Sequence, residues 1–180
     1  MKSPLKAIIW GLSLLLAGCS GEVENEYSTS RAFFRFSPVT AVPPLQQSLG
    51  NPGLYCRISF FNRTVTFTSS AGNSQQYILT DDYANRSIAF IAGFIVGTPS
   101  VPDLNGNFYQ VAYDLVCPTC YDRDAIQRSL GFSADETATC GRCHHTYSLR
   151  HGGIIEGAEG DKLKRYHITY SNNVMVIQNN

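Results

Sequence analysis

Apolar and polar residues alternate in several short segments of the chain, with the period of a β-strand. The alternation places Cys56, Ile58 and Phe60 on one face of a strand, and it returns at residues 65–67 and 166–170. A strand with one buried face has this two-residue period. These segments therefore predict antiparallel strands, and Cys56 is expected to be a small buried core residue.

Two further apolar segments predict strands without such alternation. Ile88–Val96 is continuously apolar and predicts one central strand or two short ones, and Phe108–Val116 predicts a strand that runs directly into Cys117. The proline-rich segment 33–53 is expected to be extended and turn-rich, and only residues 121–130 are expected to form a short helix. The fold class expected is mainly β, a small antiparallel β-sandwich or barrel.

The N-terminal residues differ from the rest of the chain. Lys2 and Lys6 precede a short apolar run, Ala7–Leu16, which is too short to span a bilayer as a helix. Residues 1–18 are therefore predicted to be a signal peptide. The ending Leu-Ala-Gly-Cys resembles a bacterial lipobox, which implies cleavage before Cys19 and attachment of acyl chains such as palmitate to that residue.

The lipobox resemblance implies a membrane-anchored lipoprotein of the bacterial cell envelope, in either leaflet. Residues 19–32 are polar and acidic and predict a flexible tether, and residues 33–180 are enough for a single domain. The 180-residue chain has a formal net charge of zero and no basic stripe, so nucleic acid is not an expected partner. The expected partners are the membrane, through the lipid, and an envelope protein that the sequence does not identify.

Two C-x-x-C motifs predict a metal site. The first is Cys117-Pro-Thr-Cys120, the second is Cys140-Gly-Arg-Cys143, and nineteen residues separate them. Two tight turns that face each other can bring four thiolates to one ion. Pro118 and Gly141 suit such turns.

Disulfides and redox-active thiols are the alternatives to a metal site. Export permits disulfides, but five of the six cysteines remain once Cys19 is set apart, and an odd number argues against complete pairing. A thioredoxin-like site needs one C-x-x-C that opens a helix after a strand. Here there are two motifs, and strand-like sequence follows the second, so a metal site is favoured.

The order of elements around these motifs resembles a Rieske iron–sulfur domain over residues 85–177. Cys140–Gly157 carries the resemblance: Cys140 matches a cluster cysteine, Tyr147 the family's aromatic residue, and Gly152 and Gly157 two glycines. The resemblance implies a Rieske-like β domain with a metal-binding subdomain at about residues 115–157. Cys143 stands at one of the family's two histidine ligand positions, and Cys120 stands one residue after the other. Four cysteines thus replace the family's ligand set of two cysteines and two histidines.

Three metal centres remain possible for the four-cysteine site: one zinc ion, one iron ion or a 2Fe–2S cluster. A mononuclear site holding zinc or iron is favoured, because both loops are C-x-x-C motifs, and an all-cysteine 2Fe–2S cluster is the alternative. His144 and His145 are expected to be loop residues; the alternatives are that one of them donates a hydrogen bond to a thiolate sulfur or that His144 substitutes as a ligand.

Catalytic motifs such as G-x-S-x-G or H-E-x-x-H do not occur in the chain. An enzyme is therefore not expected. The sequence predicts a structural or binding protein, or an electron-transfer protein serving an envelope oxidoreductase if the site holds a cluster.

Overall fold

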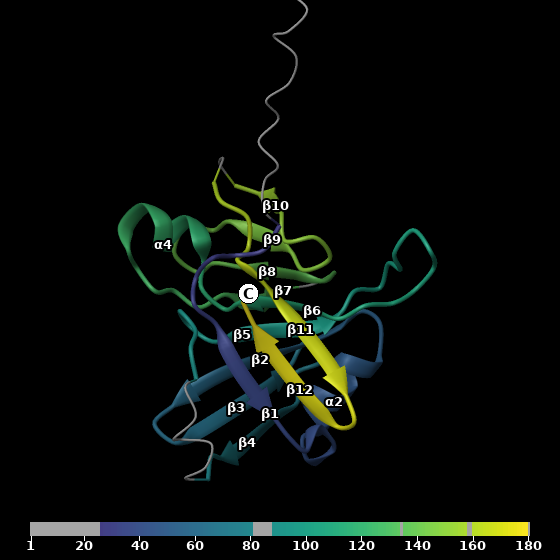
Figure 1. Ribbon diagram of the computed structural model, residues 1–180. Helices are drawn as coiled ribbons and strands as arrows, with labels where there is room; N and C mark the ends of the chain where they lie inside the picture. The colour runs from purple at the N-terminus through teal and green to yellow at the C-terminus, as the bar shows by residue number, and fades with distance from the viewer. Residues whose placement is uncertain (1–25, 81–87, 134, 158–159, 180) are drawn as a thin grey trace, which may run out of the picture.

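The computed structural model describes residues 26–80, 88–133, 135–157 and 160–179 (Figure 1). The predicted signal peptide and the predicted lipid attachment site, Cys19, lie outside these ranges. None of the helices in the described ranges is long and apolar enough to cross a membrane.

A large antiparallel sheet of eight strands forms the body of the protein (Figure 1). Its order is β1-β12-β11-β6-β5-β2-β3-β4. The sheet curls until Phe33 of β1 forms a bridge with Ala89, a residue of the segment that leads into β5. The strands are β1 (Phe33–Phe36), β2 (Leu54–Phe61), β3 (Thr64–Ser69), β4 (Ser74–Ile78), β5 (Phe94–Thr98), β6 (Val111–Asp114), β11 (Arg165–Ser171) and β12 (Val174–Gln178).

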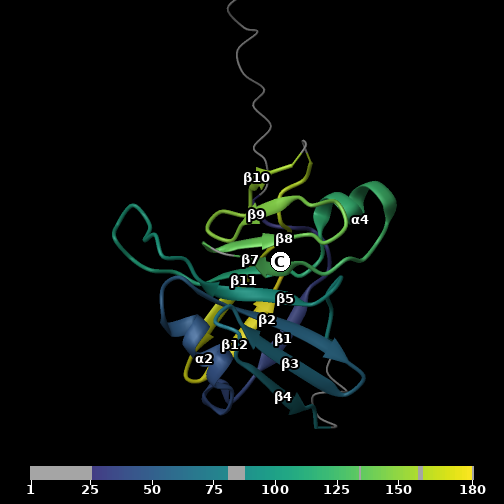
Figure 2. The ribbon, with the colours of Figure 1, turned by 180° about the vertical axis from the view of Figure 1, so that it is seen from behind.

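A small antiparallel sheet and a short helix lie together at one end of the large sheet, in both views (Figures 1 and 2). The small sheet has the order β10-β9-β8-β7, and each of its strands has three residues. The elements are α4 (Pro118–Asp124), β7 (Gly131–Ser133), β8 (Thr137–Thr139), β9 (Thr146–Ser148) and β10 (Ile154–Glu156). The mainly β class expected from the sequence is confirmed.

Two apolar cores lie on opposite faces of the central strands. Cys56 and Val96 belong to the core inside the curled sheet, whereas their neighbours Tyr55 and Ile95 belong to the core beneath the small sheet. All five residues of β5 are buried, which explains why this segment is apolar without alternation. Cys56 is fully buried, as expected.

The proline-rich segment after β1 was wrongly expected to lack a helix. A 3-10 turn, η2 (Val39–Ala41), leads into helix α2 (Pro43–Gly50). Its two prolines occupy the first helical turn, where a missing N–H group leaves no intrahelical bond unmade. Leu45 and Leu49, four residues apart, are buried on one face of the helix against the sheet.

Two other boundaries differ from the expected ones. The apolar run at 88–96 forms a strand only from Phe94 onward, because Gly93 has a φ of +121° and turns the chain just before it. The short helix expected at 121–130 begins earlier, at Pro118, and ends at Asp124. Ala125 then adopts the left-handed conformation, which terminates the helix. The first C-x-x-C motif therefore lies at the start of a helix.

The described part of the expected tether, residues 26–32, lies against the domain. The Ser28 backbone N–H donates to the carbonyl of Arg165 at 2.8 Å, and the Tyr27 ring stacks on His167 with centroids 3.7 Å apart. Asn179 accepts a hydrogen bond from the Ala32 N–H at 2.9 Å. Residues 27, 28 and 32 therefore contact the domain before β1 begins at Phe33.

Candidate metal centre

The first cysteine pair is positioned by the end of β6 and the start of α4. Cys117 is the N-cap of α4, and its carbonyl accepts the Tyr121 N–H at 3.0 Å. Its own N–H donates to the carbonyl of Arg128 at 2.7 Å. Because Cys120 lies on the first turn of the helix, its sulfur points to the same side as that of Cys117.

The segment that delivers Cys117 is fixed by Asp114, which is fully buried. The Asp114 carboxylate accepts backbone N–H groups of Ile91, Ala92 and Val116 at 2.8–3.0 Å, and the Tyr166 hydroxyl donates to it at 3.2 Å. Burial raises the pKa of Asp114, and these four donors oppose that shift. Sequence reasoning missed this role, although an aspartate inside an otherwise apolar strand was visible as a signal.

The second cysteine pair is carried by the tight connection between β8 and β9. The Cys140 N–H donates to the carbonyl of His145 at 3.0 Å, and the His144 N–H donates to the carbonyl of Cys140 at 3.0 Å. The left-handed residue of this turn is His144, with a φ of +60°, whereas Gly141 has no positive φ. The positive φ that glycine tolerates is therefore needed at 144 rather than at 141.

The four sulfur atoms converge from these two loops. The Sγ atoms of Cys117, Cys120, Cys140 and Cys143 all lie within 4.8 Å of one another, close enough to bind one metal ion. Two of the separations between the loops are short: Cys117 Sγ to Cys143 Sγ is 3.5 Å and Cys120 Sγ to Cys140 Sγ is 3.8 Å. Cys117, Cys120 and Cys140 are buried, and Cys143 is partly exposed. The structure thus brings all four predicted ligands together.

Hydrogen-bond donors surround the sulfurs. The Tyr147 hydroxyl lies 3.4 Å from Cys117 Sγ and 2.8 Å from Thr119 Oγ1, and the Arg142 backbone N–H donates to Cys140 Sγ at 3.4 Å. Such donors stabilise a thiolate relative to a thiol. The contact of Thr119 with Tyr147 depends on the fold and carries no sequence signal.

The thiols differ in their acidity. Burial raises the pKa values of Cys117 and Cys120. Burial also acts on Cys140, yet the backbone N–H groups of Cys143 and Arg142 and the adjacent Cys117 and Cys143 thiols outweigh it and lower the Cys140 pKa to about 7. A thiol that ionises near neutral pH is a ready first ligand for a cation.

The two histidines after the second motif have different surroundings. His144 is exposed. His145 is buried, its Nδ1 lies 3.3 Å from the carbonyl oxygen of Cys143, and Gly157 packs directly against its ring. Neither histidine belongs to the group of four ligand atoms found in the described residues. The His145 ring therefore packs between the second cysteine loop and Gly157.

The two alternatives to a metal site can be compared with this geometry. All five cysteines in the described ranges are free thiols, and the shortest sulfur separation given above, 3.5 Å, is far beyond the length of a disulfide bond, about 2.05 Å. The Cys117 motif does open a helix after a strand, which was the condition set for a thioredoxin-like site. However, the second cysteine pair lies against the first. The four thiols form one cluster, whereas a thioredoxin-like site has a single isolated pair.

The fold and site define a mainly antiparallel β protein with a four-cysteine cluster between a helix start and a strand connection. No family model matches the chain, and no curated protein is detectably similar to it.

Proposed function

We propose that the four cysteines hold a single zinc or iron ion in a structural role. The supporting observation is the mutual distance of the sulfurs, with cross-loop separations of 3.5 and 3.8 Å. A tetrahedron with metal–sulfur bonds of about 2.3 Å has an edge of about 3.8 Å, so these separations match those of a mononuclear site.

The same distances favour one metal ion over a 2Fe–2S cluster. In a cluster, the two thiolates on one iron are held away from the two on the other by the bridging sulfides, so all four sulfur–sulfur distances between the irons must be well beyond a single tetrahedral edge. Here the full set spans no more than 4.8 Å. An all-cysteine cluster would require the two loops to separate.

A structural role follows from the small size of the elements at the site. The four strands of the small sheet have three residues each, and α4 has seven. Such short elements are marginal by themselves. A metal bound by Cys117 and Cys120 on one side and by Cys140 and Cys143 on the other would join α4 to the β8–β9 connection, so metal binding would contribute folding energy.

The wider proposal is a lipid-anchored, Rieske-like domain of the bacterial cell envelope that acts through binding a partner rather than as an enzyme. It is supported by the lipobox pattern at Cys19 and by the element order: a strand into the first motif, a small sheet around the second, and a closing hairpin. Loss of labelled palmitate from a Cys19→Ala variant would support the anchor. Equal labelling of both proteins would overturn it.

Electron transfer is the second candidate function, and one observation favours it. The hydroxyl of Tyr147 lies 3.4 Å from the sulfur of Cys117, where a thiolate would accept its hydrogen bond, and hydrogen bonds to sulfur are among the factors that set iron–sulfur potentials. On this proposal the chain would carry electrons for an envelope oxidoreductase.

One measurement separates the two candidates: the metal content and visible absorption of protein lacking residues 1–20, purified without added metal or chelator. One zinc per chain without colour is the result expected for a structural site. One iron per chain without sulfide would also support a mononuclear site, with iron in place of zinc. Iron with sulfide and a band that bleaches with reductant would establish the cluster instead, and absence of metal would overturn both.

A further inference from the structure

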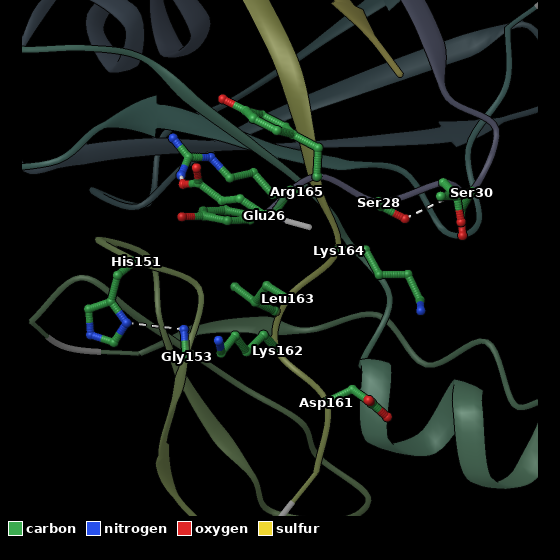
Figure 3. A pocket seen from close by; sticks show the side chains of 13 residues that line it. Glu26, Ser28, Ser30, His151, Gly153, Asp161, Lys162, Leu163, Lys164 and Arg165 are labelled. Atoms are coloured by element: carbon green, nitrogen blue, oxygen red, sulfur yellow. Dashed lines mark hydrogen bonds and ion pairs between the residues drawn. The ribbon is translucent and has the colours of Figure 1, made fainter. Parts of the chain in front are cut away.

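A second candidate site is a cavity whose lining residues include none of the four clustered cysteines. This cavity of about 610 Å³ is lined by the N-terminal segment, residues 26–30, and by residues 161–165. This volume lies within the range of small-molecule sites, roughly 300–1,000 Å³. Figure 3 shows the Arg165 and Glu26 head groups side by side, with His151 and Lys162 across the cavity from them.

Arg165 is the buried cation of this cavity. Its side chain is 16 % exposed, and burial lowers its pKa. A buried guanidinium needs an anion in contact, because removing its charge from water is otherwise costly. Lys164, by contrast, forms an ion pair with Asp122 at 2.8 Å and turns towards α4 in Figure 3. Lys164 is therefore already paired with a carboxylate of α4, and Arg165 is the buried cation of the cavity that the anion of a ligand would meet.

The anion on Arg165 is supplied by the N-terminal end of the described chain. Glu26 forms an ion pair with Arg165, yet its own side chain is 62 % exposed. Exposed ion pairs contribute little stability, and a carboxylate in water exchanges readily with other anions. The Glu26 carboxylate thus occupies the position in which the carboxylate of a ligand would meet the guanidinium.

Tyr113 supplies an independent indication of a ligand. Its side chain is fully buried and lines the same cavity, and its hydroxyl has no hydrogen-bond partner among the described residues. A buried hydroxyl without a partner is destabilising, and such groups in native proteins usually await a water or a ligand atom. A ligand with a second polar group, in addition to its carboxylate, would satisfy this hydroxyl.

We propose that this cavity binds a small carboxylate-bearing molecule through Arg165, and that Glu26 competes with the ligand for the guanidinium. A planar guanidinium forms paired hydrogen bonds with a carboxylate, the group that it already holds. The site is separate from the four cysteines and does not depend on which metal they bind. The Cζ atom of Arg165 also lies over the Tyr27 ring, 5.3 Å from its centroid, a contact that does not involve Glu26.

The test is calorimetric titration of the full chain with succinate, and with inorganic phosphate for comparison. Glu26→Gln should bind succinate roughly two- to fivefold more tightly than the unchanged protein, because the ligand no longer has to displace an exposed ion pair and such pairs contribute little free energy. Arg165→Gln should weaken binding by about tenfold or more. Arg31→Gln, which changes an exposed arginine outside the cavity lining, is the matched control and should leave the dissociation constant unchanged.

Each outcome decides the proposal. Tighter binding in Glu26→Gln, together with chemical-shift changes at Tyr113 and Arg165 on titration, would support it. No succinate binding to either the unchanged protein or Glu26→Gln would overturn it, as would equal affinities in the two. Binding of phosphate without binding of succinate would overturn the carboxylate class. Because the Glu26 side chain is exposed, Glu26→Gln should fold normally. The comparison of this variant with the unchanged protein therefore tests the proposal even if Arg165→Gln does not fold.

Discussion

The hydroxyl of Tyr147 lies 3.4 Å from the sulfur of Cys117. This contact joins β9 to the residue that caps α4, across the cysteine cluster, and Thr119 holds the same hydroxyl at 2.8 Å. The tyrosine is fully buried. The hydroxyl therefore lies where it can orient a ligand without binding the metal itself.

Replacement of Tyr147 by phenylalanine should weaken metal binding without abolishing it. Loss of an outer hydrogen bond to a ligand typically lowers metal affinity by about 10- to 100-fold. Competition with a chelator of known affinity measures the change. Tyr170→Phe, in β11 and part of the other apolar core, is the control and should bind metal normally. Equal affinities for the two variants would show that the Tyr147 hydroxyl does not support the site.

Replacement of Cys140 by serine should reduce metal content and stability together. Three thiolates hold the metal more weakly than four, and the free energy of unfolding should fall by about 3 kcal/mol or more if metal binding drives folding of this region. Metal analysis and urea unfolding give the two quantities.

Cys56→Ala is the matched control for the cysteine change, because Cys56 is fully buried in the other core. It should cost about 1–2 kcal/mol through lost packing and leave one metal per chain. A Cys140→Ser protein that lost its metal yet kept its full stability would contradict the structural role.

Glu136 should make the protein sensitive to acid. The Glu136 side chain is 8 % exposed, and it joins the β7–β8 turn to the large sheet by accepting hydrogen bonds from the Tyr55 hydroxyl at 2.8 Å and the Ser100 N–H at 3.0 Å. Arg150 adds an ion pair at 2.9 Å. Burial acts to raise the pKa of Glu136, but these donors outweigh it and hold the pKa below its ordinary value of 4.5.

The sign of the acid effect follows from that shift. Because the folded pKa is lower than the unfolded one, the stabilisation by Glu136 is present above pH 4.5 and is lost as the pH falls through the folded pKa. Glu136→Gln should lose about 2 kcal/mol at pH 7, and the difference from the unchanged protein should shrink towards pH 3. Urea unfolding at both pH values measures this, and a constant difference would exclude the mechanism.

Two glycines near the site should respond differently to alanine. Gly157 has a φ of +127°, and a Cβ atom there would lie 2.8 Å from the His145 ring. Gly157→Ala should therefore destabilise the protein by about 1–3 kcal/mol. Gly141 has no such φ, and nothing lies within 4 Å of its added Cβ, so Gly141→Ala should stay within about 0.5 kcal/mol. Thermal unfolding compares them, and the reverse ranking would refute this account of the second loop.

The spacing of residues along the chain was sufficient to predict the local features. Alternation at Cys56, Ile58 and Phe60 indicated β2, and alternation at residues 166–170 indicated β11. The two C-x-x-C motifs identified the four clustered cysteines for the same reason, because the short spacing within each motif already brings a pair of sulfurs together. Such features depend on neighbours in sequence.

Features that depend on contacts between distant segments were decided by the tertiary structure. Helix α2 forms despite its prolines because Leu45 and Leu49 pack on the sheet, and Asp114 is held in the core by donors from β11 and the segment before β5. The pairing of Tyr147 with Cys117 and of Glu26 with Arg165 likewise joins residues far apart in the chain. Hydrophobic periodicity describes one segment at a time, so only the folded packing of two segments reveals these contacts.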